Sequence, residues 1–74
     1  MLIKVDARGL QCPMPLLKAK QALRHYPDAC GVEVLASDPS SPRDFAVYAE
    51  HAGLKLVCEK TAAFTTLTLY TRDV

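Results

Sequence analysis

The residue best placed for chemistry is Cys12, in the stretch Gly-Leu-Gln-Cys-Pro-Met-Pro-Leu-Leu over residues 9–17. Apolar residues at helical spacing follow it, so Cys12 is predicted to be the N-cap of a helix whose first residue is Pro13. The partial positive charge and the free N–H groups at a helix N-terminus favour a thiolate over a thiol. We therefore expect Cys12 to have a lowered pKa and to act as a nucleophile or as the holder of a transferable sulfur atom.

Two prolines and a glycine turn surround this cysteine. Because proline fixes φ near the helical value, Pro13 and Pro15 are expected to stiffen the first helical turn, which follows a turn at Gly9. They also remove backbone donors from around the sulfur, which limits the effect of the helix dipole. The alternative is that Cys12 is a packed core residue, since free cysteines are often buried and Cys12 continues the apolar stripe of the helix. The prolines favour the chemical role, because packing alone does not need them.

The other thiols and the histidines are weaker candidates. Cys58 alternates with leucines in a predicted strand, so we expect it in the core. Cys30 lies beyond the predicted helix, about 20 Å from Cys12 by helix rise, so it is a doubtful resolving thiol. His25 and His51 fall near the far ends of the two predicted helices, so neither is expected to serve Cys12 as a base. A zinc site needs about four ligands, and these scattered residues predict none.

A second loop is expected beside Cys12. Asp38 follows a predicted strand as Cys12 does, and the carboxyl ends of parallel strands meet at one edge of a sheet. Asp38 and Arg43 are therefore predicted neighbours of Cys12. At the start of the second helix, Ser41 is the expected N-cap, and Asp44 completes an S-x-x-D capping box.

Alternation of apolar and polar residues predicts the strands, and helical spacing predicts the helices. The order is β-α-β-α-β-β, and right-handed crossovers can place both helices on the same face of the sheet. We predict an α+β fold, a two-layer sandwich with a mixed four-stranded sheet and its other face uncovered. The expected strands are 2–7, 32–37, 54–60 and 64–71, and the expected helices are 13–26 and 42–52.

Bulk composition limits the class of protein. The chain has 74 residues, 50% of them hydrophobic and 23% charged, which predicts one globular domain over residues 1–74. A net charge of +1 does not fit a dedicated nucleic-acid binder. No apolar run is long enough to span a membrane, and no secretory signal is expected. The odd number of cysteines predicts free thiols in a reducing, cytoplasmic compartment.

Two segments resemble a known family. The stretch DARGLQCPMPLLKAKQAL resembles the signature of the TusA/SirA-like sulfur-carrier proteins, with C-P-x-P at residues 12–15 after D-x-x-G-L at 6–10. The stretch ASDPSSPRDFAVYAEHAG resembles that family's second segment, with its D-P pair at 38–39 and its R-D pair at 43–44. The resemblance covers essentially the whole chain.

The resemblance implies a fold and a role. The fold would be the same sandwich, similar to the C-terminal domain of translation initiation factor 3. Cys12 would carry a persulfide, loaded by a cysteine desulfurase that depends on pyridoxal phosphate, and would pass the sulfur to a relay protein or acceptor enzyme. Destinations in the family include tRNA thiolation, molybdenum-cofactor maturation and sulfur oxidation. The carrier itself would need no cofactor, and it would act as a persulfide-transferring partner and not as a free-standing enzyme.

Partner binding and two alternatives complete the expectations. Lys18, Lys20 and Arg24 form a basic side of the first helix, with Arg8 near its start; they either steer acidic partners or are simply solvated. A monomer is expected, because a carrier docks on successive partners. The alternatives are a regulatory or RNA-associated interaction module with Cys12 merely packed, and a thiol redox sensor. The redox sensor is disfavoured because no resolving cysteine is expected nearby.

Overall fold

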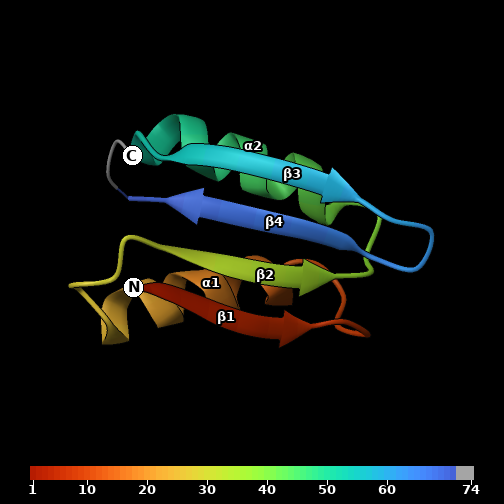
Figure 1. The fold of residues 1–74 in the computed structure, drawn as a ribbon. Coiled ribbons are helices and arrows are strands. Elements are labelled where there is room, and N and C mark those ends of the chain that lie inside the picture. The colour runs from red at the N-terminus through yellow and green to blue at the C-terminus, as the bar shows by residue number, and fades with distance from the viewer. Residues whose placement is uncertain (72–74) are drawn as a thin grey trace.

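The strands and helices follow the predicted order in the computed structural model, which describes residues 1–71. Figure 1 shows one layer of strands with both helices on the same face, so the predicted α+β sandwich is confirmed. Strand β1 has the predicted bounds, and each other element differs from its predicted bounds by one residue at one or both ends. The elements are β1 (Leu2–Ala7), α1 (Met14–His25), β2 (Gly31–Ala36), α2 (Ser41–Ala52), β3 (Lys55–Lys60) and β4 (Thr65–Tyr70).

Strand order explains where a site can form. The sheet runs β1-β2-β4-β3; β1 and β2 are parallel, and β4 is antiparallel to both of its neighbours. Because β1 and β2 point the same way, the loops that follow them, residues 8–13 and 37–40, open at the same edge of the sheet (Figure 1). Both helices start from that edge.

The core lies between the helices and the covered face of the sheet. Alternate residues of the two central strands point into it, as their apolar-polar alternation predicts. Phe45 of α2 is fully buried there, and Ala19 and Ala49 let the helices approach the sheet closely. The fully buried strand residues of the core are Ala7, Val32, Val34, Ala36, Leu67 and Leu69.

Helix α1 differs from the prediction at its ends. It begins at Met14 with Pro13 in the N-cap position, so Cys12 lies one residue before the cap and the N-cap prediction for Cys12 is wrong. Pro15 is buried in the first turn. Cys12 and Tyr26 are both exposed, because the helix tilts its buried stripe onto residues 15, 19 and 22. Cys12 is therefore not a core residue.

The start of α2 also differs. Ser40, not Ser41, occupies the N-cap position, and its side chain makes no capping hydrogen bond. Ser41 is the first helical residue, and its Oγ is buried without a hydrogen-bond partner among the described residues. The predicted capping box is wrong, because the Asp44 carboxylate turns to a different loop. The predicted stop at Gly53 is confirmed by its left-handed φ of 72°.

Cys58 shows how strand position decides burial. Its pairing with Leu67 places it on the covered face of the sheet, as alternation predicts. It is nevertheless exposed, since β3 is an edge strand with a neighbouring strand on one side only. The prediction that Cys58 belongs to the core is therefore wrong.

Candidate functional site

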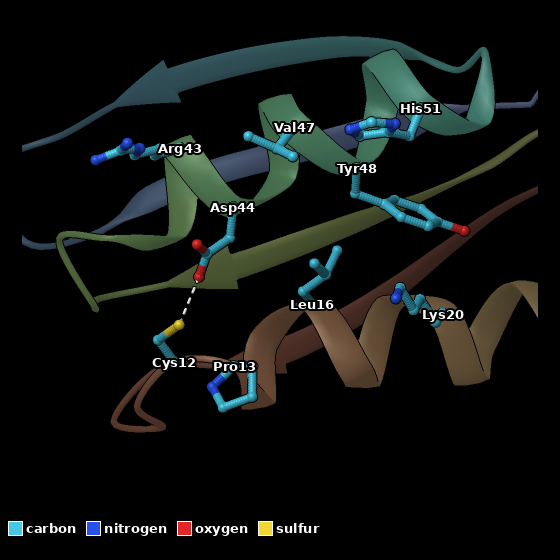
Figure 2. Close-up of a pocket in the computed structure, with 9 residues that line it drawn as sticks. All are labelled: Cys12, Pro13, Leu16, Lys20, Arg43, Asp44, Val47, Tyr48 and His51. Carbon is cyan, nitrogen blue, oxygen red and sulfur yellow. Dashed lines mark hydrogen bonds between the residues drawn. The ribbon is translucent and has the colours of Figure 1, made fainter.

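Cys12 lies in the loop between β1 and α1, and its thiol faces α2 (Figure 2). The side chain is exposed, and its Sγ lies 2.6 Å from Oδ2 of Asp44. The thiol donates this hydrogen bond, because a carboxylate accepts hydrogen bonds and cannot donate them. Asp44 is in the first turn of α2, so the contact joins the start of one helix to the start of the other.

The loop around Cys12 is held by side chains of the neighbouring loop. The backbone N–H of Cys12 donates to Oδ2 of Asp38, and the N–H of Ser40 donates to the other oxygen at 3.1 Å. These two bonds lower the pKa of Asp38, that from Ser40 first and that from Cys12 second. Gly9, with a φ of 83°, donates its N–H to Oγ of Ser37 at 2.8 Å. The predicted proximity of Asp38 to Cys12 is thus found in the structure.

The pKa of Cys12 moves in the opposite direction to the sequence-based expectation. The hydrogen bond to Asp44 raises it, because losing the proton would place a thiolate against a carboxylate. A contact with Ser40 acts in the opposite direction, while partial burial and the negative charges of Asp44 and Asp38 raise the pKa further. The expectation of a lowered pKa was wrong because it counted the helix dipole and not the carboxylates that the fold brings to the sulfur.

Of the neighbouring residues Arg43 and Asp44, the sequence suggested Arg43 as the neighbour of Cys12, but the structure places Asp44 against the thiol. Arg43 is exposed, and Figure 2 shows that its side chain does not point toward the sulfur of Cys12. Asp44, read from the sequence as a capping residue, is the side chain that touches the thiol. The sequence did contain a signal for Asp44, because it directly follows Arg43 in the segment that was expected to lie beside Cys12.

A groove of about 390 Å³ runs between α1 and α2 and begins at Cys12 (Figure 2). We call it the interhelical groove. Its walls are mostly apolar, and the ammonium of Lys20 lies 4.7 Å from the centre of the Tyr48 ring, a cation–π contact. His51 lines its far end, away from Cys12, in agreement with the sequence-based expectation. The remaining lining residues are Pro13, Leu16, Arg43, Asp44 and Val47.

The basic residues do not form one continuous side. Lys18 and Arg24 are exposed on α1, whereas Lys20 lies in the interhelical groove. Arg8 is bound to Asp6 at 2.9 Å and lies 5.5 Å from the centre of the Phe64 ring. The hydrogen bonds from Arg8 lower the pKa of Asp6 to about 2. Arg8 therefore already has an ion-pair partner in Asp6 and an aromatic partner in Phe64.

The remaining candidate residues lie away from this site. Cys30 directly precedes β2, so it lies at the end of the strands opposite to Cys12. Its thiol there is 3.2 Å from the carbonyl oxygen of Met1. His25 is exposed at the end of α1. Among residues 1–71, no group of three or more His, Cys, Asp and Glu side chains is arranged to hold a metal ion. In the same range, no helix combines the length and the apolar character needed to cross a bilayer.

The fold and the site together define a class, a small α+β sandwich that presents a cysteine where β1 passes into α1. The family model described as "Sulfurtransferase TusA" matches residues 3–71. The chain belongs to this TusA family.

Relatives and a solved structure agree with this assignment. A protein of Allochromatium vinosum named sulfur carrier protein TusA is 39% identical over 57 residues, which cover 77% of this chain and 75% of that protein. A protein of Pseudomonas syringae pv. tomato with the same name is 36% identical and covers 85% of this chain and 75% of its own length. The crystal structure of a SirA-like protein from Desulfitobacterium hafniense has a TM-score of 0.81 at 29% identity, over 99% of this chain and all of that one.

Proposed function

We propose that this protein is a sulfur carrier that holds sulfane sulfur as a persulfide on Cys12. The observation that carries the proposal is the exposed thiol of Cys12 at the mouth of the interhelical groove, in a chain of the TusA family. Relatives that cover most of this chain are named sulfur carriers, which supports the same role here.

The proposed transfer moves one sulfur atom between two thiols. The Cys12 sulfur attacks the outer sulfur of a persulfide on the donor protein, and a new S–S bond forms on Cys12. The donor's S–S bond breaks, and the donor leaves as a thiolate that takes up the proton lost by Cys12. Passing the sulfur to an acceptor thiol repeats these events in the opposite sense. No external oxidant or reductant enters, because one persulfide and one thiol are present before and after the step.

The donor is proposed to be a cysteine desulfurase dependent on pyridoxal phosphate, and the acceptor a relay protein or an enzyme of tRNA thiolation, molybdenum-cofactor maturation or sulfur oxidation. A monomeric carrier in the cytoplasm fits this role. Partners would approach along α1, where Lys18, Lys20 and Arg24 attract acidic surfaces. Arg8 is proposed to add little, since Asp6 already neutralises it.

The surrounding residues have proposed supporting roles. Pro13 and Pro15 stiffen the start of α1, and Gly9 allows the turn that precedes Cys12. Asp38 fixes the backbone of Cys12 by accepting its N–H. Arg43 lines the groove near the thiol and is placed to meet an acidic group of a partner.

The test is intact-protein mass spectrometry after incubation with a cysteine desulfurase, pyridoxal phosphate and cysteine. Wild type is expected to gain about 32 Da, one sulfur atom, by transfer to the Cys12 thiolate, and Cys12→Ser is expected to gain nothing. Cys58→Ser is the matched control, because Cys58 is also exposed, and it should load like wild type. An equal gain on Cys12→Ser, or none on wild type with several desulfurases, would remove the proposal.

The alternatives fit the site less well. An interaction module with Cys12 merely packed does not agree with an exposed Cys12. A redox sensor would need a second thiol close to Cys12, and Cys30 lies at the opposite edge of the sheet.

A further inference from the structure

The contact between Cys12 and Asp44 is not forced by packing. Cys12 is exposed and Asp44 is half-buried, so the sulfur has open space beside it. The bond at 2.6 Å nevertheless holds the sulfur against α2 (Figure 2). It depends on the proton of the thiol, because a carboxylate accepts hydrogen bonds and donates none. Any chemical state of Cys12 without that proton loses the bond.

The charged groups nearest the sulfur are negative. From α2, Asp44 accepts the thiol proton, and from the loop after β2, Asp38 accepts the backbone N–H of Cys12. Arg43 of α2 does not point toward the sulfur in Figure 2. Lys20 of α1 lies farther along the groove, over the ring of Tyr48, and His51 is at the far end. An anion at the Cys12 sulfur would therefore face two carboxylates without a nearby cation.

We infer that Asp44 is a positioning residue that separates the two states of the carrier, binding the unloaded thiol of Cys12 against α2 and repelling the loaded persulfide anion into solvent. This inference rests on the proposed sulfur-carrier function. A persulfide is more acidic than the corresponding thiol, so near neutral pH the loaded sulfur is an anion with no proton to donate. The unloaded sulfur thereby stays a thiol bound to α2, and the loaded sulfur is presented to an acceptor.

The proton balance of loading is consistent with this role. The S–H bond of Cys12 breaks, its proton passes to solvent, and the hydrogen bond to Asp44 is lost with it. Cys12 Sγ bonds to the outer sulfur of the donor persulfide, and the donor leaves as a thiolate. That thiolate takes up a proton from solvent, so the proton lost by Cys12 is balanced. The outer S–H of the new persulfide then ionises to solvent, and the anion leaves Asp44.

The first arm of the test uses the unloaded thiol and no sulfur donor. In a background of Cys30→Ser and Cys58→Ser, the rate at which iodoacetamide alkylates Cys12 is measured from pH 6 to pH 11. Asp44→Asn is expected to lower the apparent pKa of Cys12 and to raise its alkylation rate at pH 7, about tenfold for each pH unit of the shift. Glu50→Gln, which removes an exposed carboxylate from the same helix, should leave the profile unchanged.

The second arm uses the loaded state. Inorganic polysulfide loads Cys12 without a donor protein, and the transfer of the sulfur to dithiothreitol is timed. Asp44→Asn is expected to slow this transfer several-fold, because an amide can donate a hydrogen bond to the persulfide anion and retain it. Asp44→Glu keeps the charge and should restore fast transfer. Opposite changes for the two sulfur states are a signature that a merely structural role would not produce.

The outcomes separate the inference from the proposed function. The role of Asp44 would be overturned if Asp44→Asn changed the alkylation rate of the thiol and the transfer rate of the persulfide in the same direction. It would also be overturned if the rates of Asp44→Asn matched those of Glu50→Gln. Failure of a cysteine desulfurase to load wild type, with both polysulfide and alkylation results as expected, would count against the proposed function alone.

Discussion

The two ends of the sheet are closed by different kinds of bond. At the end where β2 begins, backbone groups form the links. The N–H of Cys30 donates to the carbonyl of Met1, and the N–H of Thr71 donates to the carbonyl of Cys30, both at 2.8 Å. The thiol of Cys30 also points to a backbone carbonyl. None of these acceptors changes its charge with pH.

At the other end, both links to Cys12 go to ionisable side chains. Asp38 holds the backbone of Cys12, and Asp44 holds its sulfur. The two thiols thus differ in their acceptors: the thiol of Cys30 donates to a neutral carbonyl oxygen, whereas the thiol of Cys12 donates to a carboxylate. We expect loading of sulfur on Cys12 to break the bond to Asp44 and to leave the backbone links at the other end, here called the fixed end, unchanged.

The largest effect is expected at the fixed end, from Gly31→Ala. A Cβ at Gly31 would lie 2.3 Å from the carbonyl oxygen of Leu69, a backbone atom of the paired strand that cannot move aside alone. We expect urea denaturation to show a loss in the free energy of unfolding near the upper end of the range of about 1–3 kcal/mol that is usual for overpacking. Gly53→Ala is the matched control: its Cβ meets nothing within 4 Å, and the left-handed φ should cost only about 1 kcal/mol. Equal losses would contradict this view of the fixed end.

A smaller effect on stability is expected at the site end from Asp38→Ala. This change leaves the N–H groups of Cys12 and Ser40 without their acceptor, so the loop that presents the thiol should loosen. We expect sulfur loading to slow several-fold while the urea midpoint falls less than in Gly31→Ala. Asp38→Asn retains an acceptor oxygen and should recover part of the rate. Unchanged loading by Asp38→Ala would show that this anchor is dispensable.

Acid should loosen the site end before the fixed end. The pKa of Asp38 is lowered in the folded protein, so its stabilising contribution is present above the unfolded-state pKa and is lost as pH falls through the folded-state pKa. Amide signals of Cys12 and Ser40 are therefore expected to shift in an NMR titration below about pH 4. The amide of Cys30, bound to a carbonyl, should stay constant until the protein unfolds. Parallel shifts of all three amides would rule out this difference.

The smallest effect is expected from Arg8→Gln. The bonds from Arg8 hold the pKa of Asp6 at about 2, but both side chains are exposed. An NMR titration should find the pKa of Asp6 close to its ordinary value in the variant. Thermal stability should hardly change, because exposed ion pairs contribute little. A large fall in melting temperature would mean that the contact of Arg8 with Phe64 has been undervalued.

The sequence was sufficient for the elements but not for every contact between them. Alternation placed β1 at its observed bounds, and Gly53 marked the end of α2. Cys58 was assigned to the correct face of the sheet but not to its edge strand, since alternation does not encode the order of strands.

The site was predictable where local rules point one way. Parallel strands placed Asp38 beside Cys12, as expected. Asp44 satisfied a local capping pattern equally well, and only a contact 32 residues away in the chain decided its partner. The direction of the Cys12 pKa shift depends on that contact, so no local pattern contained it.

The measurement that tests the central claim most directly follows a labelled sulfur atom. The wild-type protein is loaded from ³⁴S-labelled cysteine by a cysteine desulfurase, chased with an acceptor thiol, and digested for peptide mass spectrometry. The proposal predicts that the label appears on the Cys12 peptide and disappears from it during the chase. Label on the Cys30 or Cys58 peptide, or label on Cys12 that the acceptor does not remove, would contradict it.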